Sequence, residues 1–431
     1  MTNDLPILKI ENQRLAQQIA FIMEMDKLKS VDRMTKIVCE DRVENDAEHS
    51  WHVALMALVL APYAKAEVDI QRVITLLLIH DVVEIDAGDT YIYSNANADD
   101  QFANELKAAK RIFGLLPDEQ AKFLTEAWQE FEARETPEAK FAKAIDRLSP
   151  FVYYAYAGEG CLIEQGVNVD MVRKQMVSIA DVSEPLQEMF EKLLAAYVEF
   201  GVVLNSDGKP FGPKRDVELG KSMADFSFGD PDLHQRMQFV IELDELKSIL
   251  RQTQLVSVDR LENDAEHSWN LAIMAVLMTE YANQEIDLLR VLKMLLIHDI
   301  VEIDAGDSPI YDAAAKEDQE ERELRAAKRL FGLLPQEVGE EFMALWQEFE
   351  AHKSNDAQFA RSMDRLSPLL YNFYTKGVRW AKFGVSNKDV LKRLVIIKDG
   401  SDMLWDLGQS IIEQAVENGF LKRFVDERLE R

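Results

Sequence analysis

Histidines and carboxylates gather in two short segments of the first half of the chain. His49 lies in ENDAEHSW, residues 44–51, and His80 is followed directly by Asp81 in LLLIHDVVEIDAGD, residues 76–89. Imidazole nitrogens and carboxylate oxygens together suit Mn²⁺, Fe²⁺, Co²⁺ or Zn²⁺, with water completing the coordination shell. A metal held in this way polarises phosphoryl oxygens and lowers the pKa of bound water. The residue types therefore predict a divalent-metal site with hydrolytic chemistry.

Two further acids extend this pattern. Glu84 follows His80 by four positions and Asp81 by three, which places it over the same helical face. Asp146, in AKAIDRLSP, is an acid in an otherwise apolar helical segment. Ionised groups in such segments need a counter-charge or a metal. The alternative is a buried salt-bridge network, which is disfavoured because each buried ion carries a large desolvation penalty.

The whole arrangement occurs twice. ENDAEHSW returns at residues 262–269, and MLLIHDIVEIDAGD occupies residues 294–307. The two copies are offset by a constant 218 positions, as the histidines His49 and His267 show (267 − 49 = 218). The register holds without a net insertion over residues 21–200. This is a tandem duplication with too long a period for a solenoid, and both copies are expected to share one fold.

Length and composition predict how the copies are arranged. A chain of 431 residues with 47% hydrophobic residues is expected to form two packed domains of about 200 residues each. The segment between the copies is rich in Gly, Pro, Ser and Asp, which is typical of a linker. We expect a lead-in segment without a counterpart at 1–20, copy one at 21–200, the linker at 201–232 and copy two at 233–431.

The apolar periodicity within each copy is that of helices. A helix starting at Asp46 would carry a buried stripe of His49, Val53, Met56 and Leu60. Further helices are expected at 69–85, 100–113, 118–134, 137–156 and 170–200. Because strictly alternating strand patterns are absent, the predicted fold is all-α.

Charge and hydropathy exclude several classes of partner. The net charge of −28 argues against a nucleic-acid polymer or an anionic membrane surface, since both require clustered Lys and Arg. The longest apolar runs, such as VALMALVLA at 53–61, are too short to span a bilayer, and the acidic N-terminus does not match a secretory signal. The two cysteines, Cys39 and Cys161, cannot form a disulfide framework. We therefore expect a soluble cytoplasmic protein.

The motifs resemble those of a known family. The pattern H…HD…D, with the words ENDAEHSW and IHDVVEIDAGDT, is similar to the HD-domain metal-dependent phosphohydrolases, and in particular to their small 5′-deoxynucleotidases. The resemblance covers both copies and implies two tandem all-α HD-domain bundles. It implies one divalent metal ion per domain (Mn, Co, Fe, Zn or Mg). The ligands that it implies are His49, His80, Asp81 and Asp146 in copy one and His267, His298, Asp299 and Asp364 in copy two.

The resemblance also implies catalytic acids. Glu84 and Glu302 match the family's acid/base glutamate three residues beyond the HD pair. Asp89 and Asp307 match a further acid that helps to position water and substrate.

Arginines ahead of the first histidine are candidates for binding a phosphate. Arg33 and Arg251 match the substrate arginine that the resemblance implies. For Arg42 and Arg260 two interpretations stay open, a substrate contact and a surface or helix-capping salt bridge. His52 has no histidine counterpart in copy two and is interpreted as a helix-surface residue.

The function that the resemblance implies is phosphate release from (deoxy)nucleoside 5′-monophosphates. Two alternatives stay open: hydrolysis of another small phosphoester, and non-catalytic, metal-dependent nucleotide sensing. A binding module does not need a proton-transfer acid beside the metal, so Glu84 and Glu302 favour the hydrolase. Small enzymes of this family pair as dimers, and we expect the two copies to form an intramolecular pseudo-dimer.

Overall fold

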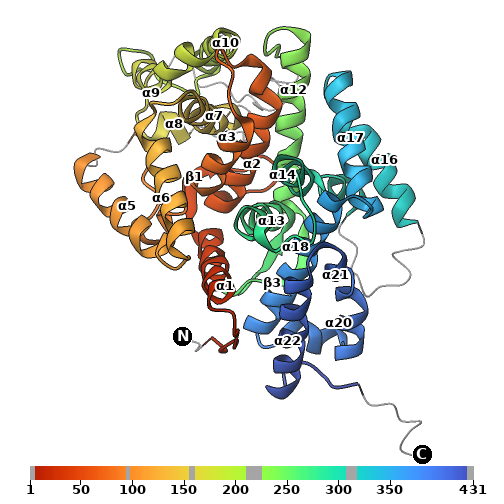
Figure 1. The fold of residues 1–431 in the computed structure, drawn as a ribbon. Coiled ribbons are helices and arrows are strands. Elements are labelled where there is room, and N and C mark those ends of the chain that lie inside the picture. Colours follow the sequence, from red (N-terminus) through yellow and green to blue (C-terminus); the bar gives the residue numbers. More distant parts are fainter. Residues whose placement is uncertain (1–4, 94–97, 155–160, 210–225, 307–317, 425–431) are drawn as a thin grey trace, which may run out of the picture.

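The chain is predominantly helical. A computed structural model describes residues 5–93, 98–154, 161–209, 226–306 and 318–424, and it confirms the predicted all-α fold (Figure 1). In this part of the chain no helix has both the length and the apolar character needed to cross a membrane.

The elements of copy one are α1 (Gln13–Met25), η1 (Asp26–Ser30), β1 (Asp32–Lys36), β2 (Val43–Asn45), α2 (Asp46–Leu60), η2 (Ala61–Tyr63), α3 (Ile70–Ile79), α4 (Glu84–Ala87), α5 (Ala98–Phe113), α6 (Asp118–Ala133), α7 (Pro137–Tyr153), α8 (Cys161–Glu164), α9 (Val169–Val182) and α10 (Glu184–Phe200). Those of copy two are α12 (Pro231–Glu242), η3 (Leu243–Ser248), β3 (Leu250–Gln254), β4 (Leu261–Asn263), α13 (Asp264–Met278), η4 (Thr279–Tyr281), α14 (Leu288–Ile297), α15 (Glu302–Ala305), α16 (Gln319–Phe331), α17 (Gln336–Ala351), α18 (Asn355–Tyr374), α19 (Val378–Phe383), α20 (Asn387–Leu394), α21 (Ile397–Gly400) and α22 (Asp402–Glu417).

Each copy also contains one short antiparallel hairpin that the sequence pattern did not predict. β1 pairs with β2, and β3 pairs with β4, directly ahead of the helix that carries the first histidine. The longer strand reads DRMTK in copy one, so it gives no alternating apolar signal. Arg33 lies in β1 and Arg251 in β3, and the hairpins therefore position both candidate substrate arginines.

The helix expected at 69–85 is interrupted at the HD pair, which corrects the prediction. α3 ends at Ile79, and α4 begins only at Glu84. Between them the Glu84 N–H donates to the Asp81 carbonyl oxygen at 2.9 Å, a tighter i to i+3 bond than that of an α-helix. The chain therefore turns directly after the histidine and carboxylate.

The helix expected at 170–200 is likewise two helices. α9 ends before Ser183, and the Ser183 hydroxyl caps α10 by accepting the Leu186 N–H at 3.3 Å. Pro185 in the first turn of α10 lacks the N–H that a continuous helix needs, which explains the break.

The predicted boundary at residue 20 falls inside a helix. α1 runs over Gln13–Met25, and α12, which starts at Pro231 within the expected linker, is its counterpart at the same offset of 218 (231 − 13). The lead-in therefore has a partner element in copy two, contrary to the prediction. The sequence similarity of the two helices is too weak to show this before their positions are known.

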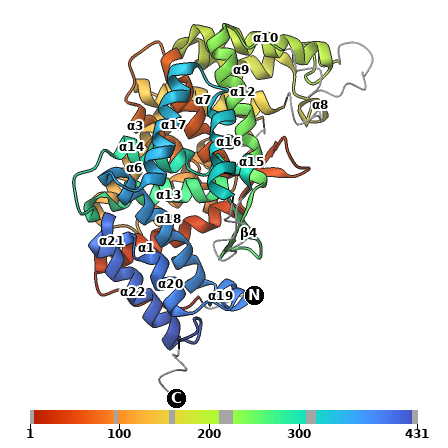
Figure 2. The ribbon, with the colours of Figure 1, turned by 90° about the vertical axis from the view of Figure 1, so that its right-hand side faces the viewer.

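The two copies pack closely against each other. α2 and α13 lie side by side in the middle of the molecule, and α12 of copy two packs on α2 (Figure 1). α9 and α10 of copy one lie at one end, and α20 and α22 of copy two lie at the other (Figure 2). The buried apolar side chains of both copies form one continuous cluster.

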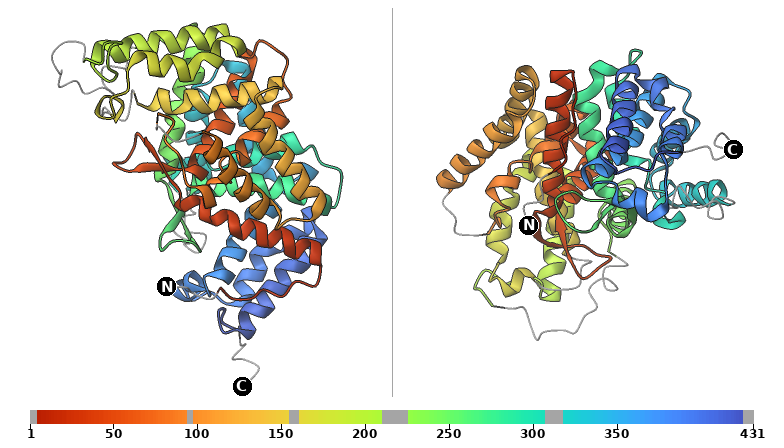
Figure 3. Two further views of the ribbon diagram at one scale, coloured as in Figure 1. Left: turned by 90° about the vertical axis from the view of Figure 1, so that its left-hand side faces the viewer. Right: turned by 90° about the horizontal axis from the view of Figure 1, so that it is seen from below.

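The N-terminal helix extends this packing toward the last helices of the chain. Seen from below (Figure 3, right), α1 lies between helices of copy one and helices of copy two, and it contacts α5 and α13. Ahead of it, the Lys9 backbone N–H donates to Gln414 Oε1 at 2.9 Å, and Gln414 Nε2 donates to the Lys9 carbonyl oxygen at 2.9 Å.

Candidate metal centres

The first histidine of each copy is placed by a capped helix start. Asn45 Oδ1 accepts the N–H groups of Ala47 and Glu48, each at 3.1 Å, and the Glu48 carboxylate accepts the Asn45 N–H at 2.9 Å. This reciprocal capping box starts α2 at Asp46, three residues before His49. His49 is then completely buried in the first turns of the helix.

The second histidine is placed by the end of α3. His80 Nδ1 lies 2.7 Å from the carbonyl oxygen of Leu77. Because a carbonyl oxygen only accepts, Nδ1 carries a hydrogen, and in the neutral ring Nε2 is the atom with the free lone pair. Nε2 is buried and has no hydrogen-bond partner, so the ring presents an unsatisfied ligand atom to the centre of the fold.

Four side chains of copy one converge at this point. Ligand atoms of His49, His80 and Asp81 all lie within 4.8 Å of one another. Asp146, from α7, places Oδ1 3.0 Å from His49 Nε2 and 3.6 Å from His80 Nε2. Asp81 Oδ2 lies 3.1 Å from His80 Nε2. The structure thus brings together the four side chains that the sequence grouped.

Copy two repeats the cluster. His267, His298 and Asp299 again have ligand atoms within 4.8 Å of one another. Asp364 Oδ1 lies 3.3 Å from His267 Nε2, and Asp299 Oδ2 lies 3.2 Å from His298 Nε2. His298 Nδ1 is 2.9 Å from the carbonyl oxygen of Leu295, which leaves its buried Nε2 without a hydrogen-bond partner.

The donor sets fit a divalent cation. Two imidazole nitrogens and two carboxylates form a mixed nitrogen and oxygen set of the kind that Mn²⁺, Fe²⁺, Co²⁺ and Zn²⁺ accept. Burial disfavours a charged His80, but Asp81 and Asp146 outweigh it and raise the pKa of His80 to about 10. In copy two burial and Arg251 oppose the charge, yet Asp364 and other acids raise the pKa of His267 to about 9. Both clusters therefore attract positive charge.

Glu84 and Asp89 lie beside the cluster of copy one. Both line a cavity of about 430 Å³ that also reaches His80, Asp81 and Arg33. Burial, followed by the charge of Asp81, raises the pKa of Glu84 to about 10. Burial also raises the pKa of Asp89, although Arg33 partly offsets it. Each acid is thus shifted toward the protonated form.

Of the two corresponding acids of copy two, the structure describes Glu302. Glu302 begins α15 as Glu84 begins α4, and it is buried. Asp307 lies outside the described residues.

The arginine of β1 reaches the cluster. Arg33 Nη1 donates to Asp46 Oδ1 at 2.7 Å and to Asp81 Oδ2 at 2.6 Å. In copy two Arg251 Nη1 makes the same pair of contacts, at 2.7 Å with Asp264 and 2.5 Å with Asp299. An arginine guanidinium therefore contacts one of the carboxylates of each cluster.

Arg42 does not line the cavity. Its Nη2 donates to Glu48 Oε1 at 2.7 Å and to the Lys247 carbonyl oxygen of copy two at 2.7 Å. Arg260 makes the equivalent contacts with Glu266 and with the Lys29 carbonyl oxygen. Of the two interpretations left open, the structure supports the helix-capping salt bridge and adds a contact between the copies.

The interpretation of His52 as a surface residue is wrong. His52 is fully buried, and its Nε2 lies 2.9 Å from the Val240 carbonyl oxygen of α12. Burial, with a contribution from Lys247, holds the pKa of His52 well below its usual range, so the ring is neutral. The packing of α12 on α2 covers this face of α2, which the sequence of one helix does not reveal.

The sequence pattern did not predict that a basic residue lies beside each cluster. Lys143 Nζ lies 3.0 Å from Asp146 Oδ2 and 4.4 Å from the centre of the Phe131 ring. In copy two Arg361 takes this place, with Nη1 3.3 Å from Asp364 Oδ2. The available signal was a basic residue three positions ahead of the last acid in both copies.

Comparison with known proteins places the chain in a family. The HD domain model matches residues 25–188 and 243–405, so the chain belongs to the HD domain family and carries the domain twice. This confirms the resemblance and the tandem duplication.

Its relatives include enzymes. The human 5′-deoxynucleotidase HDDC2 is 28% identical over 151 residues, which are 35% of this chain and 72% of the human protein. The same protein of Bos taurus is 30% identical over 136 residues, 31% of this chain and 64% of the bovine protein. A crystal structure of a predicted metal-dependent phosphohydrolase from Magnetospirillum magnetotacticum MS-1 has 51% identity, covers 44% of this chain and 96% of its own, and has a TM-score of 0.43.

Proposed function

We propose that this protein is a divalent-metal phosphohydrolase that releases phosphate from (deoxy)nucleoside 5′-monophosphates. The observation that carries the proposal is the buried, unpartnered Nε2 of His80 within a cluster of carboxylates, next to a cavity lined by Glu84 and Arg33. Relatives named 5′-deoxynucleotidase support the same reaction class.

In the proposed centre one divalent ion is held in each copy. The ligands are His49, His80, Asp81 and Asp146, and in copy two His267, His298, Asp299 and Asp364. Such an ion supplies Lewis-acid chemistry, withdrawing charge from a phosphoryl oxygen and acidifying water.

The two acids of the cavity carry out one proton transfer each. The water oxygen attacks phosphorus while Asp89, the acid whose charged form Arg33 favours, accepts the water's proton. As the bond between phosphorus and the 5′-oxygen breaks, its electron pair stays on that oxygen, and Glu84 donates a proton to it. Burial, followed by the charge of Asp81, raises the pKa of Glu84, and this direction supports its role as the proton donor. The products are a nucleoside and phosphate. Glu302 and Asp307 take these roles in copy two.

Cations and aromatic rings of the cavity suit the two ends of a nucleotide. Arg33, held by Asp46 and Asp81, faces the phosphate, and Arg251 has this role in copy two. At the cavity wall the exposed Phe102 ring stacks on the buried Trp128 ring at 5.8 Å between centres, and Phe102 offers an apolar surface to a base. The cavity volume of about 430 Å³ lies in the range of small-molecule sites.

The test is phosphate release from a panel of deoxy- and ribonucleoside 5′-monophosphates with Mn²⁺, Co²⁺, Mg²⁺ or EDTA. We expect release that EDTA abolishes and that falls at least about 100-fold in the Glu84→Ala/Glu302→Ala double variant. Glu67 and Glu285, exposed glutamates at equivalent positions of the two copies, supply the matched control Glu67→Ala/Glu285→Ala, which should keep full activity.

Absence of release from every monophosphate, with metal bound, would refute the nucleotidase. Release from other small phosphoesters in the same experiment would instead support the broader phosphohydrolase. Nucleotide binding without turnover would support the sensor.

A further inference from the structure

The first histidine of copy one lies next to a glutamate, and this glutamate is paired with a lysine of copy two. Glu44, in β2, places Oε2 3.3 Å from His49 Nδ1. Its other oxygen, Oε1, accepts a hydrogen bond from Lys247 Nζ at 2.8 Å. Lys247 lies in η3 of the second copy. The chain of contacts therefore runs from one copy into the candidate metal centre of the other.

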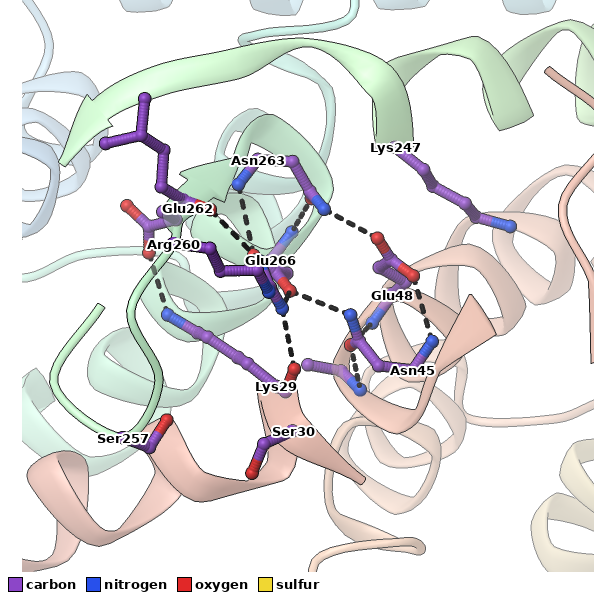
Figure 4. Close-up of polar contacts among 12 residues, drawn as sticks. Lys29, Ser30, Asn45, Glu48, Lys247, Ser257, Arg260, Glu262, Asn263 and Glu266 are labelled. Carbon is purple, nitrogen blue, oxygen red and sulfur yellow. Dashed lines mark hydrogen bonds and ion pairs between the residues drawn. The ribbon is translucent and has the colours of Figure 1, made fainter. Parts of the chain in front are cut away.

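The same arrangement occurs in the opposite direction. Lys29, in η1 of copy one, donates from Nζ to Glu262 Oε1 at 2.7 Å (Figure 4). Glu262 Oε2 lies 3.5 Å from His267 Nδ1. Lys29 and Lys247 are separated by the repeat offset of 218 (247 − 29), as are Glu44 and Glu262 (262 − 44), so the two-fold relation holds residue by residue.

Both glutamate–lysine pairs are buried. Glu44, Lys29 and Lys247 are each 1% exposed, and Glu262 is fully buried. A buried carboxylate without a partner is strongly disfavoured, so each glutamate depends on a nearby cation. In both pairs the lysine approaches one carboxylate oxygen and the histidine lies beside the other.

This geometry suits the support of a metal ligand. A histidine that binds metal through Nε2 needs its hydrogen on Nδ1, and a carboxylate that accepts this hydrogen fixes both tautomer and ring orientation. His80 and His298 obtain the same support locally, from the carbonyl oxygens of Leu77 and Leu295. His49 Nδ1, by contrast, forms no hydrogen bond but lies at ion-pair distance from the Glu44 carboxylate, whose buried lysine partner comes from the other copy.

The second histidine is also linked to the opposite copy, through the backbone. Trp51 Nε1 donates to the Leu296 carbonyl oxygen at 3.0 Å, two residues before His298. Trp269 Nε1 donates to the Leu78 carbonyl oxygen at 2.9 Å, two residues before His80. Each copy thus helps to hold both histidine-bearing elements of the other.

We propose that Lys29 and Lys247 are positioning residues that act across the molecule, each completing the metal centre of the other copy through Glu262 and Glu44. Each centre then has its full metal affinity only when the opposite copy is docked. This inference rests on the metal-binding role of the clusters proposed above.

The test uses the full chain with one cluster disabled at a time. His80→Ala disables copy one and leaves the centre of copy two for titration, and His298→Ala does the reverse. Co²⁺ is the probe, and its affinity is measured from its visible absorption and by competition with a chromophoric chelator, without substrate. Lys29→Met and Lys247→Met are then added to each parent in turn, which makes each lysine the matched control of the other.

We expect a crossed result. In the His80→Ala parent, Lys29→Met should weaken Co²⁺ binding by about 10- to 100-fold, while Lys247→Met leaves it within about twofold. In the His298→Ala parent, Lys247→Met should weaken it and Lys29→Met should not. A lysine that affects the centre of its own copy, equal effects on both centres, or no effect on either would overturn the inference.

Loss of folding must be separated from loss of positioning. Thermal unfolding followed by circular dichroism identifies any variant that does not fold. If Lys29→Met is one of these, Lys29→Met/Glu262→Gln removes both buried charges together, and it should fold yet bind Co²⁺ at copy two more weakly. Unchanged affinity in that variant would overturn the inference. Parents that bind no Co²⁺ would overturn the proposed metal function as well.

Discussion

Asp81 makes two contacts that join the candidate metal cluster to the candidate substrate arginine. Its Oδ2 lies 3.1 Å from His80 Nε2 and 2.6 Å from Arg33 Nη1. His80 and Arg33 outweigh the burial that opposes the charged form, and they hold the pKa of Asp81 below its usual range. A carboxylate that stays ionised while buried is suited to a cationic centre.

Replacing the arginine of this contact by lysine should impair substrate binding. Arg33 Nη1 contacts both Asp46 and Asp81, and a lysine ammonium that made these contacts would lack the further N–H groups with which a guanidinium binds phosphate. We expect Arg33→Lys/Arg251→Lys to raise KM for a nucleoside monophosphate by about tenfold or more.

The matched control is the other arginine pair of the hairpins. Arg42 and Arg260 contact capping glutamates and the opposite copy. Arg42→Lys/Arg260→Lys should lower the melting temperature and leave KM unchanged. Equal KM effects of the two double variants would contradict a substrate role for Arg33.

At the scale of the elements, the starts of α2 and α13 are joined. Asn45 caps α2 and its Nδ2 donates to Glu266 Oε1 at 2.8 Å. Asn263 caps α13 and its Nδ2 donates to Glu48 Oε1 at 2.6 Å (Figure 4). Each cap therefore satisfies its own helix and the capping glutamate of the other.

Removing one of these caps should cost more than removing an ordinary one. Asn45→Ala loses the cap and also leaves buried Glu266 with one donor fewer, and we expect a loss of about 2–3 kcal/mol in the free energy of unfolding. Asn168, which caps α9 through the Met171 N–H, is the control, and Asn168→Ala should cost about 1 kcal/mol. Denaturant titration measures both. Equal losses would show that the contact with Glu266 adds nothing to stability.

At the scale of the molecule, the two copies share one interior. The buried apolar side chains form a single cluster across both, and α2 packs directly on α13. An interface of this kind resembles a domain core divided in two, which is typical of obligate assemblies.

Cutting the connection between the copies should leave them together. A protease site inserted between residues 210 and 225 and then cleaved should yield two fragments that elute as one species of the intact mass in size-exclusion chromatography. The uncut chain is the control. Elution of the fragments at half the mass would show that the contacts between the copies are too weak to hold them without the covalent link.

Much of the candidate site was determined by the sequence. The close spacing of His80, Asp81 and Glu84, and their return 218 residues later as His298, Asp299 and Glu302, are local properties of the chain. Polar groups within apolar helical segments are disfavoured unless they meet a partner, so their presence alone indicates a site. The helical class follows in the same way from periodicity.

Only the tertiary structure decided how the copies contact each other. The burial of His52, the capping role of Arg42 and the pairing of Lys247 with Glu44 all depend on contacts between residues far apart in the sequence. A buried lysine in a short polar segment looks the same in sequence as an exposed one. The difference arises from the packing of α12 and η3 on α2, because burial and long-range pairing are properties of the assembled core and not of the local pattern.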